Sequence, residues 1–185
     1  MRKMLQALYK ISLLKRLVPS LLKIFIKIFR KNEVIIKDKD VSFILNLTNP
    51  IDREIYLKGN YEKEQIDFLS KEIKNNDIKY FLDIGAHMGI YSINISKKNI
   101  LTYSFEPVKK NYEQLKRKKK INNINNIKLH KIASSNEKKK IKMWVPDKEK
   151  TGGFSIYDKN DEELKKYNEK KNFNIESKSD LGDNL

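Results

Sequence analysis

Two carboxylates and two glycines are the residues of this sequence best placed to do chemistry. Asp83, Gly85 and Gly89 form the pattern D-x-G-x-x-x-G at the end of a short apolar run, and Glu106 ends the next apolar run. Glycine lets the backbone turn sharply and approach a ligand closely. A carboxylate at the end of the second strand of such a unit accepts hydrogen bonds from ribose hydroxyls. The pattern therefore favours a cofactor that contains a nucleoside.

The charges of these residues indicate which nucleoside cofactor fits. A dinucleotide fingerprint, G-x-G-x-x-G, has one glycine more and places a pyrophosphate on a helix N-terminus. The Asp83 carboxylate would repel a pyrophosphate. S-adenosylmethionine carries a ribose, an ammonium and a sulfonium but no phosphate, so Asp83 and Glu106 match it better than NAD. The alternative is an ordinary strand-to-helix turn and a solvated acid, because a glycine-rich loop alone is weak evidence.

The elements around these residues alternate between strand and helix. Short apolar runs predict strands, and amphipathic stretches between them predict helices. We expect strands over 78–84, 101–105, 127–133 and 140–145, and helices over 90–97 and 109–120. This order is typical of a parallel sheet with right-handed crossovers. Ligands bind beyond the carboxyl ends of the strands in such a sheet, which is where the motif lies.

A different pattern precedes the alternating block. Residues 34–36 and 41–47 predict two strands around a polar turn, with Ile44 breaking the alternation and Asn49-Pro50 ending the hairpin. Asn60 is placed to cap a helix whose apolar residues share one face: Ile66, Leu69 and Ile73.

Composition excludes several classes of site. The chain has 185 residues, a net charge of +16, no Cys and two His. Disulfides, thiolate metal sites, cysteine nucleophiles and His-rich metal sites are therefore excluded, and we expect no metal. His130 lies inside a predicted strand, where a structural role is expected. We expect a cytoplasmic protein.

The first 32 residues hold nine cations and no acid. Cations interrupt the segment too often for a membrane span or a secretory signal. From Pro19 onward an amphipathic helix is predicted, with its apolar arc formed by Leu21, Leu22, Ile24, Phe25, Ile26, Ile28 and Phe29. One interpretation is peripheral contact of residues 17–31 with an anionic membrane, at its inner face. The other is a helix packed on the domain with a solvated basic face, and both stay open.

A second basic cluster lies in the helix expected over 109–120. Its cations are Lys109, Lys110, Lys116, Arg117, Lys118, Lys119 and Lys120. No aromatic residues interleave with them as a stacking platform requires, so nucleic-acid binding is disfavoured and an exposed helix side is expected. The alternative to an enzyme is nevertheless a non-catalytic basic module that binds anionic membrane or nucleic acid.

The motif region resembles a known family. Residues 81–92 (FLDIGAHMGIYS) and 103–107 (YSFEP) closely resemble the FkbM-type family of S-adenosylmethionine-dependent methyltransferases. Residues 59–62 (GNYE), the Asn-rich turn at 122–126 and Ala133-Ser134 are also similar, and the resemblance covers about residues 51–146. It implies a class I methyltransferase (Rossmann-like) fold. It also implies an enzyme that O-methylates a glycan, lipid-linked or natural-product hydroxyl.

The resemblance also implies roles for individual residues. Gly85 and Gly89 shape the loop, and Asp83 orients the loop or the amino-acid end of the cofactor. Glu106 holds the ribose. The pocket is further lined by Ala86, by His87 (more usually Asn in the family) and, near adenine, by Ala133. No residue is assigned as the catalytic base.

Four segments follow from these patterns: a basic amphipathic helix (1–32), a lead-in hairpin and helix (33–76), a Rossmann-like cofactor-binding half-domain (77–146) and a polar, partly disordered tail (147–185) with a short helix over about 161–166. Family members continue into a fourth strand beside the first. The resemblance therefore implies an α/β fold that is incomplete at the C-terminus, an exposed apolar edge on the first strand and a truncated chain.

Overall fold

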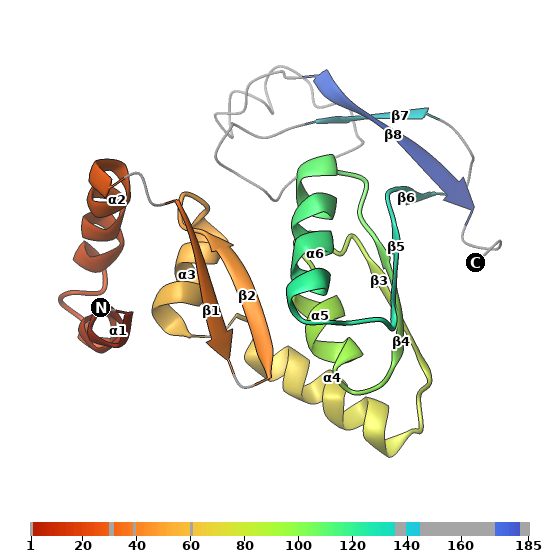
Figure 1. Cartoon of the computed structure of the whole chain (residues 1–185), viewed down its shortest axis with the longest axis horizontal. Helices are drawn as coiled ribbons and strands as arrows, with labels where there is room; N and C mark the ends of the chain where they lie inside the picture. Colours follow the sequence, from red (N-terminus) through yellow and green to blue (C-terminus); the bar gives the residue numbers. More distant parts are fainter. Residues whose placement is uncertain are drawn as a thin grey trace. The chain divides into compact units, whose positions relative to one another are not determined.

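The computed structural model describes residues 2–29, 32–38, 40–59, 61–135, 140–144 and 173–181 (Figure 1). It divides the chain into two compact units, Met1–Asp67 and Phe68–Leu185. In the part of the chain that it describes, no helix is long and apolar enough to cross a membrane.

The first unit combines an antiparallel hairpin with helices. Its elements are α1 (Arg2–Lys10), α2 (Leu17–Phe29), β1 (Glu33–Asp38), β2 (Val41–Asn46) and α3 (Pro50–Lys58). The hairpin register places Ile36 opposite Phe43, both of them buried, and α3 packs against β2. Ile44, which interrupts the sequence alternation, is buried as well, so β2 is covered on both faces. The predicted hairpin is confirmed.

Two helices of this unit correct the sequence analysis. Asn49-Pro50 begins a helix instead of simply ending the hairpin. The Asn49 side chain accepts a hydrogen bond from the Ile51 N–H at 2.9 Å, and Pro50 occupies the first helical turn, where its missing N–H costs nothing. The described residues 2–29 form two helices where one was expected, and α2 begins at Leu17, two residues before Pro19.

Helix α4 (Lys63–Asn75) runs from the first unit into the second. Residue 60, the predicted cap of this helix, lies outside the described residues. Ile73 of α4 is buried with Ile95 and Ile100, and Leu69 and Phe81 pack against this cluster. Leu69 and Ile73, two of the three residues of the predicted apolar face, therefore pack in the core of the second unit.

The second unit contains the predicted parallel sheet. Strands β3 (Tyr80–Ile84), β4 (Leu101–Phe105) and β5 (Ile127–His130) pair in the order β3-β4-β5. Helix α5 (Ile90–Ser96) connects the first two strands and α6 (Lys109–Ile121) the last two. Both strand pairs of this sheet are parallel, which confirms the predicted alternation of strand and helix and the α/β class.

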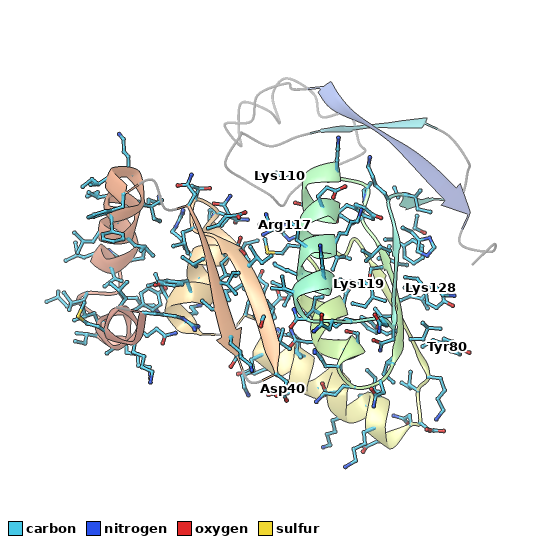
Figure 2. The ribbon with its side chains drawn as sticks, viewed as in Figure 1. Asp40, Tyr80, Lys110, Arg117, Lys119 and Lys128 are labelled. Carbon is cyan, nitrogen blue, oxygen red and sulfur yellow. The ribbon has the colours of Figure 1, made fainter. Side chains whose placement is uncertain are left out.

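The two faces of this sheet differ. Helix α5 packs against β3 and β4, and α6 packs against β5. The face of the sheet that these helices cover is one of two. On β3 the other face carries Tyr80, Leu82 and Ile84, whose side chains are 60%, 54% and 64% exposed. Figure 2 shows Tyr80 and Lys128 on the side of the sheet away from α6. Among the described strands β3 pairs with β4 alone.

A second small sheet follows. It is formed by β6 (Ala133–Ser135), β8 (Phe173–Leu181) and β7 (Lys140–Trp144), with β8 in the centre. The strand expected over 127–133 therefore ends at His130, and Ala133 begins a separate strand. Strand β7 confirms the strand expected over 140–145, whereas β8 corrects the expectation of a tail without strands. The helix expected over 161–166 lies outside the described residues.

Candidate functional site

The loop that joins β3 to α5 follows an unusual backbone path. Gly85, His87 and Gly89 have φ angles of 77°, 52° and 78°, so three of five consecutive residues are left-handed. Glycine adopts this conformation without a steric penalty, whereas an L-residue in it costs about 1–2 kcal/mol of conformational free energy. Histidine and asparagine are among the side chains that tolerate it best. His87 therefore occupies a position whose conformation also suits asparagine.

Backbone hydrogen bonds attach this loop to the end of β4. The N–H groups of Gly85 and Ala86 both donate to the carbonyl oxygen of Phe105, at 2.9 and 3.0 Å. The Gly89 N–H then donates to the Ala86 carbonyl at 2.7 Å. The loop consequently bends over the carboxyl ends of β3 and β4, the edge predicted from the sequence.

Glu106 is buried at this edge and binds the loop through its carboxylate. Its Oε2 accepts a hydrogen bond from the His87 N–H at 2.7 Å. Its Oε1 accepts from the Val108 N–H at 2.8 Å and from Asn111 Nδ2 at 3.5 Å. The backbone N–H of Glu106 donates to the carbonyl oxygen of His130 at 3.0 Å. This one residue therefore joins the β3–α5 loop, the start of α6 and the end of β5.

Asp83 makes a separate set of contacts, toward α5. Its Oδ2 accepts from the Ser92 N–H at 3.0 Å and from the Ser92 hydroxyl. The Ser92 hydroxyl in turn lies 2.7 Å from the Ser104 hydroxyl. Asp83 thus holds the first turns of α5 against β3 and β4.

The two carboxylates share a low-dielectric environment. Burial raises the pKa of Asp83, and the hydrogen bonds from Ser92 oppose this shift. Burial also raises the pKa of Glu106. Bonds from Val108, His87 and Asn111 lower it in part, and the charge of Asp83 raises it further. The Asp83 and Glu106 carboxylates therefore repel each other and favour a positive ligand.

The two glycines of the motif have different surroundings. A Cβ built on Gly89 would lie 2.0 Å from Leu115 Cδ1 of α6, so Gly89 is required for α5 and α6 to pack. A Cβ built on Gly85 would meet no atom within 4 Å. Gly85 therefore borders open space at the loop surface, where a ligand can approach the backbone.

The sequence analysis missed three polar residues of this site. Ser92, Ser104 and Asn111 are buried and bind the two carboxylates directly or through one another. The sequence signal for Ser104 is weak, since it is a polar residue in an apolar strand. Asn111 follows Glu106 by five residues, inside a lysine-rich helix in which polar residues carry little information.

The remaining predicted residues lie farther along the chain. Ala133 begins β6, where it pairs with Ser179 of β8 instead of extending β5. The His130 ring stacks on Phe105 with the ring centroids 4.8 Å apart. Burial, then the charge of Lys128, lowers the pKa of His130.

The basic cluster of α6 divides into exposed and buried cations. Figure 2 shows Lys110, Arg117 and Lys119 along this helix. Lys118 is fully buried, and the Lys119 ammonium donates to the Ile127 carbonyl at 2.6 Å. The helix side is therefore not uniformly solvated, which corrects the expectation from sequence.

No model of a known protein family matches the chain, and no characterised protein sequence matches it either. Solved structures do resemble it. One is a SAM-dependent methyltransferase from Agrobacterium tumefaciens, with a TM-score of 0.45 and 12% identity, covering 55% of this chain and 33% of that one. Another is M. jannaschii TYW2 in complex with AdoMet, with a TM-score of 0.40 and 23% identity, covering 54% and 42%. The chain matches less than half the length of either protein.

The different surroundings of the two glycines can be tested by a matched pair of substitutions. Both glycines have positive φ, so Gly85→Ala should lower the free energy of unfolding by about 1–2 kcal/mol through backbone strain alone. Gly89→Ala carries the same strain plus the clash with Leu115, which adds about 1–3 kcal/mol. Urea unfolding would measure both changes. An equal loss in the two variants would contradict the packing role of Gly89.

The raised pKa of Asp83 leads to a pH dependence. The folded state binds more protons than the unfolded chain above the ordinary value of 3.8, so this group makes the free energy of unfolding fall as the pH rises through the raised pKa. In Asp83→Asn this decrease should be smaller than in the wild type, measured by urea unfolding between about pH 4 and about pH 7. Asp40→Asn, at an exposed aspartate (Figure 2), is the matched control and should behave as wild type. Parallel curves for the wild type and Asp83→Asn would contradict a partly buried carboxylate whose ionisation costs free energy.

Proposed function

We propose that this chain binds S-adenosylmethionine and is the cofactor-binding part of a methyltransferase with a class I fold. The observation that carries the proposal is the buried Glu106 carboxylate at the tip of β4, bonded to the backbone of the glycine loop that follows β3. Two adjacent parallel strands thus bring an acidic residue and an open glycine backbone to one edge of the sheet.

The bonds of Glu106 fit a ribose. A carboxylate has about four acceptor positions, and the protein fills one on Oε2 and two on Oε1. Oε2 therefore keeps capacity for a hydroxyl without losing its bond to His87. A hydrogen bond from a hydroxyl to an ionised carboxylate is stronger than a neutral one, which suits a residue that orients a nucleoside.

The charges at the site fit the rest of this cofactor. Glu106 is buried, Asp83 is partly buried and the two repel each other, so a cationic ligand would lower the pKa of both and stabilise their ionised forms. An ammonium group satisfies this requirement, whereas a pyrophosphate would add two negative charges. The open space beside Gly85 allows the ligand to approach the loop backbone.

S-adenosylmethionine, when bound, supplies an electrophilic methyl group on a cationic sulfur. The contribution of this chain is alignment, since a methyl acceptor must approach in line with the sulfur–methyl bond. Glu106 would fix the ribose, Asp83 the amino-acid end, and Gly85 the distance between loop and cofactor. Ala86 and His87 border the same loop.

The proposed reaction is O-methylation of a hydroxyl on a glycan, a lipid-linked molecule or a natural product. This finer assignment rests on the resemblance of residues 81–92 and 103–107 to the FkbM-type family. Those two stretches contain Asp83, Gly85, Gly89 and Glu106, which lie at the ends of β3 and β4 or in the loop that follows β3.

The ribose assignment can be tested by calorimetry with S-adenosylmethionine. Glu106→Gln keeps an oxygen for the His87 N–H but loses the charge, so the dissociation constant should rise by at least about tenfold. Glu113→Gln, at an exposed glutamate of α6, removes the same charge away from the loop and should leave the affinity unchanged.

The outcomes of this experiment separate the possible errors. Equal affinity in wild type and Glu106→Gln would overturn the role of Glu106. Failure of the wild type to bind S-adenosylmethionine while binding NAD would overturn the choice of cofactor. Failure to bind either would count against the cofactor-binding role itself.

A further inference from the structure

Helix α2 has two apolar faces, and only one of them is packed. Val18, Leu22 and Ile26 are buried, with 3%, 3% and 5% of their surface exposed. The other face leaves four large aliphatic side chains in solvent. We call these residues the outer stripe: Leu17, Leu21, Ile24 and Ile28, which are 54%, 61%, 57% and 67% exposed. Packing on the unit therefore accounts for the buried face of this helix but not for the outer stripe.

The outer stripe is narrow and has cations along one side. At about 100° per residue its four side chains fall within an arc of roughly 60°. Lys23 and Lys27 follow on the side away from the buried face, and both are exposed. The helix thus presents an apolar strip beside a basic strip, and both strips point into solvent.

The residues before α2 continue this pattern. Met4, Ile11 and Leu13 are 59%, 50% and 83% exposed, and Lys3 and Lys10 are exposed as well. No acidic residue occurs in the first 32 positions, which hold nine cations. Exposed aliphatic side chains and unopposed positive charge are therefore concentrated in one segment of the chain.

The partner of such a surface must be apolar and negatively charged at once. A nucleic acid supplies the negative charge but no apolar layer for four adjacent Leu and Ile side chains. A second copy of this chain supplies the apolar layer but would bring another nine cations against the first nine. The surface of an anionic bilayer provides both, with phosphates for lysines and an acyl boundary for aliphatic side chains.

We propose that residues 2–29 dock on the surface of an anionic phospholipid bilayer. The outer stripe of α2 enters the acyl boundary, and Lys23 and Lys27 lie at the level of the headgroups. Because α2 has 13 residues, it lies along the surface instead of crossing the bilayer. This surface is separate from the candidate cofactor site, so its test does not depend on methyltransferase activity.

The experiment is cosedimentation of the full chain with vesicles of phosphatidylcholine, with and without about 30% phosphatidylserine. The wild type should bind the anionic vesicles, and binding should weaken as salt is added. Lys23→Gln/Lys27→Gln should reduce the affinity by about 30-fold, since each lysine near an anionic surface contributes about fivefold. Ile24→Asp should reduce it by at least about tenfold, since it places a charge in the outer stripe.

Two matched controls distinguish binding through residues 2–29 from non-specific binding to vesicles. Lys109→Gln/Lys110→Gln removes the same charge from exposed lysines of α6 and should change vesicle affinity by less than about threefold. Phe68→Asp alters an exposed apolar residue of α4 and should leave binding unchanged. These substituted side chains are all exposed, so the variants should fold.

Four results would overturn the proposal. The first is equal binding to neutral and anionic vesicles. The second is an equal loss from the two double lysine variants. The third is a solution dimer that Ile24→Asp separates, with no vesicle binding. The fourth is oligonucleotide binding that depends on Lys23 and Lys27, with no vesicle binding.

Discussion

The arrangement of the second unit depends on one buried carboxylate. Glu106 lies where β4 ends and accepts hydrogen bonds from the backbone of the β3–α5 loop and of the residue before α6. A buried carboxylate costs free energy unless donors surround it, so the loop and helix must keep the positions that supply those donors. The same constraint makes the carboxyl edge of the sheet rigid and polar. A ligand that binds there meets groups that are already oriented.

Packing on the far side of the loop adds a second constraint. Gly89 must be glycine because Leu115 of α6 fills the space of its Cβ, whereas Gly85 has no atom in the corresponding space. Gly89 thus allows α5 and α6 to pack closely, and Gly85 leaves the loop backbone accessible. His87 accepts a left-handed conformation between them, and its N–H reaches Glu106 from there.

Much of the fold of the second unit could be predicted from sequence, because the hydrophobic pattern of the strands and the position of the glycine motif indicate the same parallel sheet. The alternation of β3, α5, β4, α6 and β5 follows from short apolar runs, and the approach of Asp83 and Glu106 follows from parallel topology. Residue type alone did not reveal Asn49 as a helix cap, since Asn-Pro is equally typical of a turn. The buried position of Lys118 in a run of cations, and the partners Ser92 and Asn111, depend on tertiary contacts that no local pattern records. The strand at 173–181 pairs with partners distant in sequence, and its polar composition gave no periodic signal.

The electrostatics of the acid pair couple ligand binding to stability. Asp83 and Glu106 raise the free energy of the folded state when both are ionised, because Glu106 is buried, Asp83 is partly buried and the two charges repel each other. The polar groups around them, mainly backbone N–H groups and hydroxyls, offset part of this cost but carry no net positive charge. A cationic ligand supplies the missing charge, so its binding free energy includes relief of that repulsion. The features that make this sheet edge costly in the free protein are therefore the same features on which the proposed preference for a positively charged nucleoside over a phosphorylated one rests.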